Sequence, residues 1–247
     1  MDASLWPAVA LVFFFAGMVK GLVGLGLPTL AMGLLTIFMP PLGATGLLLV
    51  PSLATNVWQA LAGPALRRIG RRLWPLGLGI VAGTWWSVLP ALGTASGVAR
   101  PALGAVLLAY ATVGLLDLRL PGVSARHEGW LSALVGYLTG TVTAATGVFV
   151  LPAVPYLQAL RLPKDELVQA LGLSFTLSTL ALGLHLSLRT PLAVAELALS
   201  SAAVVPAVLG MLAGQKARAM LSEQRFRRVF FMGLGLLGLH MLAGSLG

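Results

Sequence analysis

Apolar runs follow one another along the whole chain, separated by short joints rich in arginine, proline or glycine. Because about 20 apolar residues are needed to cross a hydrocarbon core of roughly 30 Å, each run of this length predicts a membrane span. Four predicted spans are ordinary apolar helices, and two more carry polar residues at helical spacing. In that order they are Leu73–Leu92, Val98–Leu116, Pro191–Ala213, Val229–Leu246, Gly43–Ala62 and Leu167–Leu186.

Two further segments, Leu5–Phe38 and Trp130–Leu160, are too long for one crossing. A helix over the whole first segment would measure about 51 Å at a rise of about 1.5 Å per residue. The stretch GLVGLGLP interrupts the first segment, and TGTVTAATGVFVLP interrupts the second. We therefore expect each segment to form two half-length helices joined by broken backbone.

The basic residues distinguish two topologies. If each long segment crosses the membrane once, lysines and arginines divide almost evenly between the two sides. If each returns to its own side, as a re-entrant hairpin or as two short crossings, thirteen of the 16 fall on one side, which the positive-inside rule assigns to the cytoplasm. In this topology the two termini lie outside, as do the loop residues Arg100 and Arg189. Lys20 lies at membrane depth. The thirteen are Arg67, Arg68, Arg71, Arg72, Arg119, Arg126, Arg161, Lys164, Lys216, Arg218, Arg225, Arg227 and Arg228.

The second topology makes the later half of the chain an inverted repeat of the first, an architecture common among transporters. Each half, residues 1–122 and 123–247, would contain a broken hairpin and three spans. The predicted fold class is an all-α polytopic membrane protein with two inverted halves. Sparse matches support the repeat: Gly17 and Gly21 with Gly136 and Gly140, and Pro41, Ser52 and Asn56 with Pro163, Ser174 and Ser178.

The composition agrees with a membrane protein. The chain is 58% hydrophobic and 9% charged, with a mean hydropathy of +0.95, whereas a soluble domain carries roughly 25% charged residues. The net charge of +9 does not indicate nucleic-acid binding, because the basic residues lie in the joints between spans. With no cysteine, disulfides and thiolate metal sites are excluded. We predict no metal and no cofactor.

The broken segments are the strongest candidates for a binding site. Unpaired backbone groups at membrane depth are tolerated where protein covers them or where they line a watery cavity. The start of a half-helix, here at Pro28, also attracts anions. Lys20 would either contact an anion or extend to the membrane surface. The glycines of the break, Gly21, Gly24 and Gly26, would either shape this site or serve only close helix packing.

Neutral polar groups follow the breaks. Ser52, Asn56 and Gln59 recur at i, i+4 and i+7, on one helical face. Such groups either bind a solute or hold helices together. The predicted substrate-binding residues are Lys20, Gly21, Gly24, Gly26, Ser52, Asn56, Gln59, Thr143, Thr146, Gln169, Ser174, Thr176 and Ser178.

No pattern in the sequence indicates catalysis. Cysteine is absent, and neither a G-x-S-x-G nor an H-E-x-x-H motif occurs. His185 and His240 are expected near the outer ends of helices, where a structural role is more common. We predict no catalytic residue and no enzyme.

Four stretches resemble the TauE/SafE family of sulfite exporters: GLVGLGLPTLAMGLLTIFMPP, PSLATNVWQALAG, LTGTVTAATGVFVLPAVPYLQAL and LVQALGLSFTLSTLAL. The likeness covers nearly the whole chain. It implies a bacterial inner-membrane transporter, built from duplicated halves, for small sulfur-containing anions such as sulfite or organosulfonates. It also implies roles for Asn56, Gln59, Gln169, Ser174 and Thr176. The second break here is rich in threonine, which leaves the particular substrate open.

The expected function is a secondary transporter or facilitator that moves a small anion by alternating access at a midplane site between the two broken helices. Its expected partners are the anionic solute and the lipid bilayer, with no nucleic acid. A homodimer is compatible with the sequence, although no residue indicates one. The alternatives are an intramembrane enzyme and a channel or assembly subunit without a transport cycle.

Overall fold

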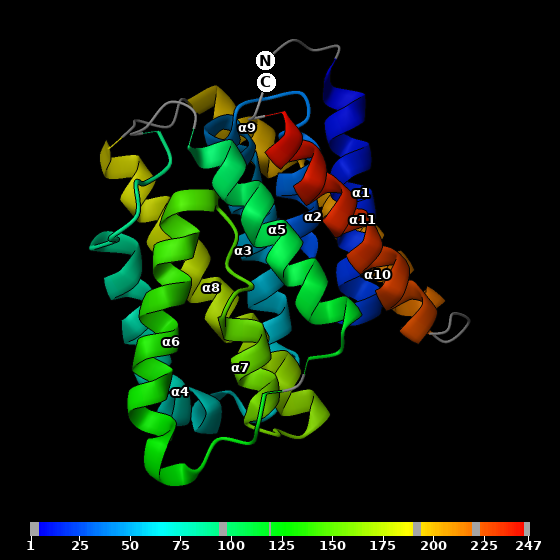
Figure 1. The fold of residues 1–247 in the computed structure, drawn as a ribbon. Coiled ribbons are helices and arrows are strands. Elements are labelled where there is room, and N and C mark those ends of the chain that lie inside the picture. Colours follow the sequence, from blue (N-terminus) through cyan, green and yellow to red (C-terminus); the bar gives the residue numbers. More distant parts are fainter. Residues whose placement is uncertain (1–4, 94–97, 119, 190–193, 219–222, 245–247) are drawn as a thin grey trace. The chain divides into compact units, whose positions relative to one another are not determined.

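The computed structural model describes residues 5–93, 98–118, 120–189, 194–218 and 223–244. Every regular element among these residues is a helix, as predicted (Figure 1). The ends of two predicted spans, Pro191 and Leu246, and the joint residue Arg119 lie outside the described residues. The helices are α1 (Trp6–Val23), α2 (Leu27–Leu35), α3 (Pro41–Leu61), α4 (Leu66–Trp85), α5 (Ala99–Leu115), α6 (Ala125–Thr146), α7 (Ala153–Ala159), α8 (Lys164–Arg189), α9 (Val194–Ala202), α10 (Val204–Ala217) and α11 (Glu223–Ala243).

Four stretches of helix among the described residues are long and apolar enough to cross a membrane. They are Trp6–Val23, Lys164–Arg189, Leu197–Ala217 and Gln224–Ala243. Together with the all-helical architecture, they identify a polytopic membrane protein.

Several helices differ from the predicted spans at their ends. Helices α4 and α11 begin at Leu66 and Glu223, before the predicted starts at Leu73 and Val229. Arginine, glutamate and glutamine are good helix formers, so a helix continues through a basic joint where an apolar span stops. The span predicted from Pro191 to Ala213 contains two helices, α9 and α10, separated at Ala203.

Both overlong segments are broken near the predicted positions. The first gives α1 and α2, separated by residues 24–26, and the second gives α6 and α7, separated by residues 147–152. The second segment also folds back on itself. The Tyr156 hydroxyl of α7 lies 2.7 Å from Ser132 Oγ and donates to the Glu128 carbonyl oxygen over 3.1 Å, near the start of α6. This segment is therefore a hairpin that returns toward its own beginning.

The chain divides into two compact units. Unit 1 comprises residues 1–51, 97–117 and 192–247, and unit 2 comprises residues 52–96 and 118–191. Both units draw on both halves of the sequence, and the boundary between them falls inside α3. The compact units are therefore different from the two sequence halves, and the division into repeats at residue 122 stays a prediction.

Each unit contains close helix crossings built from glycines, of which one in each unit pairs two glycines on each helix. In unit 1, α1 crosses α10, and a Cβ at Gly17 or Gly210 would overlap a backbone carbonyl oxygen of the other helix. In unit 2, α4 crosses α6, and a Cβ at Gly83 or Gly136 would do the same. Each crossing pairs two small-xxx-small motifs, the arrangement that brings membrane helices close together. The pairs are Gly17 and Gly21 with Gly210 and Gly214, and Gly79 and Gly83 with Gly136 and Gly140.

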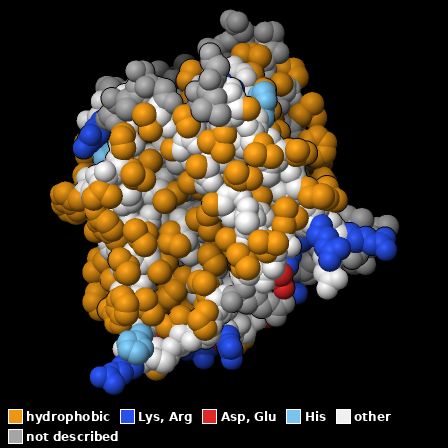
Figure 2. Space-filling view, viewed as in Figure 1, with side chains coloured by type: hydrophobic (Ala, Val, Ile, Leu, Met, Phe, Trp, Pro, Cys, Tyr) orange, Lys and Arg blue, Asp and Glu red, His pale blue; other side chains and the backbone are white. Residues whose placement is uncertain are grey.

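The outer face of α6, in unit 2, is largely apolar. Hydrophobic side chains cover this helix, and basic and histidine side chains lie at its N-terminal end (Figure 2). Trp130 and Leu134 are among the exposed apolar residues there. Exposed apolar surface of this kind suits lipid, and the charged rim suits the headgroup region.

Candidate functional site

The first break, in unit 1, has the backbone geometry that its glycines predict. Gly24 ends α1 with φ of 80°, and its N–H donates to the Lys20 carbonyl oxygen over 2.8 Å. Gly26 precedes α2 with φ of 108°. Only glycine adopts such left-handed conformations at little steric cost. Pro28 occupies the second position of α2, where a missing N–H costs nothing. The prediction that Pro28 starts the second half-helix is confirmed.

The first turn of α2 also holds a buried hydroxyl that sequence reasoning missed. Thr29 is fully buried, and its Oγ1 has no hydrogen-bond partner among the described residues. The N–H groups in the first turn of a helix have no partner within that helix. Hydroxyl and N–H donors therefore share one helix end. The available signal was a polar residue directly after Leu27 and Pro28 in an otherwise apolar stretch.

Lys20 places a buried amine close to this break. It lies in the last turn of α1, and only 3% of its surface is exposed. The side chain is thus enclosed by protein rather than extended to solvent. Gly21, the next residue, lies at the crossing of α1 and α10, where a Cβ would overlap the Met211 carbonyl oxygen. Close packing accounts for Gly21, and its predicted contact with substrate stays a prediction.

In unit 2 the C-terminal part of α3 packs antiparallel against α8. Asn56 Nδ2 lies 3.5 Å from Thr179 Oγ1. One turn further along α3, backbone atoms of Gln59 and Ala60 would lie 2.5–2.8 Å from a Cβ at Gly172. The missing side chain of Gly172 lets the two helices approach this closely.

Two buried serines lie along the same helix pair. Ser52 precedes Asn56 by one turn of α3, and Ser178 is next to Thr179 on α8. Both serines are fully buried, and neither hydroxyl has a hydrogen-bond partner among the described residues. A buried polar group left without a partner costs about 1–3 kcal/mol. The structure therefore brings three predicted residues, Ser52, Asn56 and Ser178, to one polar helix pair.

The two predicted glutamines connect the ends of these helices. Gln59 Nε2 donates to a carbonyl oxygen near the start of α8 over 3.1 Å. Gln169 Nε2 donates to the carbonyl oxygens of Ala60 and Gly63 over 2.8 and 2.6 Å, and its Oε1 accepts from the Ala65 N–H over 2.9 Å. These bonds use both kinds of group on the Gln169 amide. Gln169 thus holds the turn between α3 and α4, and its predicted contact with substrate stays a prediction.

The remaining predicted hydroxyls are engaged within their own helices. Each donates to the carbonyl oxygen four residues earlier, over 2.7–2.8 Å. An anion needs donors, and these hydroxyl protons are already used. They belong to Thr143, Thr146, Ser174 and Thr176.

The second break, in unit 2, is lined by apolar residues. Gly147 ends α6 with φ of 71°, and the Val148 N–H donates to Thr146 Oγ1 over 3.2 Å. Val148, Phe149 and Val150 are buried, and the Phe149 ring packs on Phe175 of α8. The break thus fixes α7 against α8 through apolar contacts.

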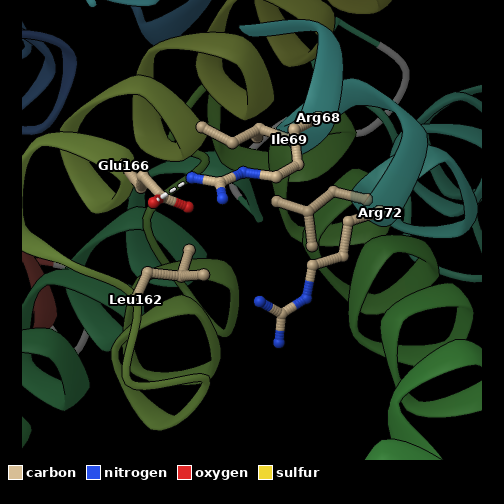
Figure 3. Close-up of a pocket in the computed structure, with 6 residues that line it drawn as sticks. Arg68, Ile69, Arg72, Leu162 and Glu166 are labelled. Carbon is tan, nitrogen blue, oxygen red and sulfur yellow. Dashed lines mark hydrogen bonds and ion pairs between the residues drawn. The ribbon is translucent and has the colours of Figure 1, made fainter. Parts of the chain in front are cut away.

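A small basic cavity lies at the start of α4 in unit 2 (Figure 3). It has a volume of about 90 Å³, and both of its arginines are paired with carboxylates. Arg68 forms an ion pair with Glu166 of α8, and Arg72 donates to both carboxylate oxygens of Glu128 on α6. The hydrogen bond to Glu128 raises the pKa of Arg72. These ion pairs join α4 to its two neighbours, so the cavity offers an anion little unpaired charge.

Two further predictions concern the histidines and a possible metal site. Among the described residues, no group of three or more histidines and carboxylates is placed to hold a metal ion. His185 packs edge-on against Trp85, with ring centroids 5.9 Å apart. Its structural role stays a prediction.

The comparison with known proteins gives the family. The model of the family described as sulfite exporter TauE/SafE matches residues 9–241. No curated protein and no solved structure matches the chain. Because the match includes both broken segments and the polar helices that follow them, the chain belongs to the TauE/SafE family of sulfite exporters, which are membrane transporters.

Proposed function

We propose that the protein is a secondary transporter or facilitator that moves a small sulfur oxyanion or organosulfonate across the bacterial inner membrane. The observation that carries this proposal is that the buried hydroxyls of Ser52 and Ser178, on the same helix pair, have no hydrogen-bond partner among the described residues. Natural proteins rarely leave buried polar groups unpaired. An oxyanion that accepts hydrogen bonds from both serines would satisfy them and replace part of the water lost on entering the membrane.

Features of unit 1 support the same class of substrate. The first turn of α2 combines N–H donors with the orphan hydroxyl of Thr29, and helix N-termini attract anions. A protonated Lys20, buried near the end of α1, would add positive charge to this unit. The alternating access expected of such a transporter, with the site open to one side at a time, belongs to this proposal.

Anion-dependent stability tests the proposal. Melting temperatures of the detergent-purified protein are measured with sulfite, sulfate, thiosulfate, an organosulfonate, a carboxylate and chloride, because a ligand that binds the native state raises stability by mass action. We expect a selective rise with one sulfur anion. Ser178→Ala should weaken this effect at least about tenfold in ligand concentration, since each lost bond to a charged group is worth about 1.5–3 kcal/mol.

Ser174→Ala is the matched control, because Ser174 lies one turn away on α8 and its hydroxyl donates to its own helix. It should keep the ligand effect. Lys20→Met should lower anion affinity, whereas Lys216→Met, at the basic end of α10, should not. If no sulfur anion raises the melting temperature, or if Ser174→Ala and Ser178→Ala behave alike, the proposed donor site is wrong.

Flux into proteoliposomes distinguishes the transport classes. A carrier shows a rate that saturates with sulfite concentration, whereas a channel conducts far faster and does not saturate in the same range. Saturable flux that Ser178→Ala lowers would place these serines on the transport route. Flux unaffected by either serine would remove them from it.

A further inference from the structure

A surface groove in unit 2, on the outer side of the α4–α6 pair, takes no part in the proposed anion site. It has a volume of about 540 Å³, within the roughly 300–1,000 Å³ common for ligand pockets. Trp74, Leu78 and Tyr137 line it with large side chains, and Gly79, Gly129 and Ala133 line it with small ones.

The groove exists because the two helices present small residues to each other. Gly79 lies at the close crossing with α6, where a Cβ would overlap the Ala133 carbonyl oxygen. Gly129, in contrast, borders open space, because a Cβ there would meet nothing within 4 Å. Trp74 and Leu78 are each 61% exposed and stand beside this open space.

The length of the groove suits one lipid chain. Gly129 and Tyr137 lie along α6 about 12 Å apart at a helical rise of about 1.5 Å per residue. One leaflet of the hydrocarbon core is about 15 Å thick. The groove therefore follows most of one leaflet, along the direction in which an acyl chain runs.

Two unpaired arginines stand at one end of this groove. Arg71 precedes Trp74 by three residues and Leu78 by seven, so it continues their face of α4. On α6, Arg126 precedes Gly129 by three residues and Ala133 by seven, so it continues their face of that helix.

Both arginines are exposed, and in the described part of the chain neither forms an ion pair. Their neighbours Arg68 and Arg72 are paired with Glu166 and Glu128. Arg71 and Arg126 thus bring unpaired positive charge to one end of the groove.

We propose that this groove binds an anionic glycerophospholipid. One acyl chain lies between Trp74 and Tyr137, and the phosphate accepts hydrogen bonds from Arg71 and Arg126. Arginine suits this role because its planar guanidinium group binds phosphate oxygens in pairs. Basic pockets at the cytoplasmic ends of membrane helices recognise acidic lipid headgroups in this way.

The test compares three additives on the full-length protein in detergent. Phosphatidylglycerol should raise the melting temperature more than phosphatidylcholine of the same chain length, and inorganic phosphate should not. Arg71→Ala combined with Arg126→Ala should abolish the extra rise in melting temperature that phosphatidylglycerol gives over phosphatidylcholine. The matched control is Arg225→Ala combined with Arg228→Ala, which removes two exposed arginines of α11 and should keep that extra rise.

A second variant tests the acyl-chain part. Gly129→Leu adds a side chain to the groove at a position where a Cβ meets nothing within 4 Å, and it should reduce stabilisation by both lipids. Equal effects of the two lipids, an equal effect of free phosphate, or equal losses in both double variants would overturn the proposal. So would a dimer in lipid-free detergent that Gly129→Leu converts to a monomer, since the groove would then bind a second copy of the chain.

Discussion

At the scale of single residues, hydroxyl side chains of similar chemistry on α8 differ in their hydrogen bonding. Ser174 and Thr176 donate to carbonyl oxygens of α8, whereas Ser178 on the same helix has no partner among the described residues. All three are serine or threonine within two turns of one apolar helix. The side-chain rotamer and the neighbouring helix decide whether such a hydroxyl forms a hydrogen bond or is left without a partner.

This difference leads to a prediction on stability. Ser178→Ala should raise the unfolding free energy of the ligand-free protein by about 1 kcal/mol, because it removes a buried hydroxyl without a partner. Ser132→Ala should lower it, since Ser132 Oγ lies 2.7 Å from the Tyr156 hydroxyl and would leave that group with one bond fewer. Thermal melts without added anion measure both. A loss of stability in Ser178→Ala would mean that this hydroxyl has a structural partner.

At the scale of the helices, spacing identified the right glycines. Gly17 and Gly21, and Gly136 and Gly140, were matched from the sequence as parts of two repeats, and in each unit such a pair forms one side of a close crossing. Which helix lies opposite could not be predicted. The partners are α10 and α4, and their own glycine pairs, Gly210 with Gly214 and Gly79 with Gly83, were not singled out.

The crossings predict opposite effects of glycine substitution within one helix. Gly83→Ala should prevent α4 from packing on α6, because its Cβ would overlap the Tyr137 carbonyl oxygen. Gly70→Ala, also in α4, meets nothing within 4 Å and should stabilise the protein by roughly 0.5–1 kcal/mol through helix propensity. The yield of monodisperse protein and its melting temperature measure both effects. A well-folded Gly83→Ala protein would show that the crossing tolerates separation of the helices.

At the scale of the whole molecule, the charge count and the fold-back of the second long segment agree. The count favours segments that return to their own side, and Tyr156 binds the start of α6, as such a hairpin requires. The two lines of reasoning are independent, because one uses loop charges and the other hydrogen bonds within the segment. The sidedness itself stays a prediction.

Single cysteines test the sidedness on the natural cysteine-free background. Ser124 and Ser187, both exposed, lie before α6 and near the end of α8. If the second segment is a hairpin, the span that follows places them on opposite sides. A membrane-impermeant thiol reagent should then label Ser187→Cys in intact spheroplasts and Ser124→Cys only after permeabilisation. Labelling of both under the same condition would instead support a single crossing.

By itself, the sequence determined the membrane class, the two broken segments and the family. These follow from local patterns: apolar length, glycine and proline within a span, and the placement of charge. Only the tertiary structure decided which donors are free, which helices cross and how the chain divides into units. Those properties depend on contacts between residues far apart in the sequence. Thr29 and Gln169 illustrate the limit. Both side chains are buried, but the Thr29 hydroxyl has no hydrogen-bond partner among the described residues, whereas the Gln169 amide forms three hydrogen bonds.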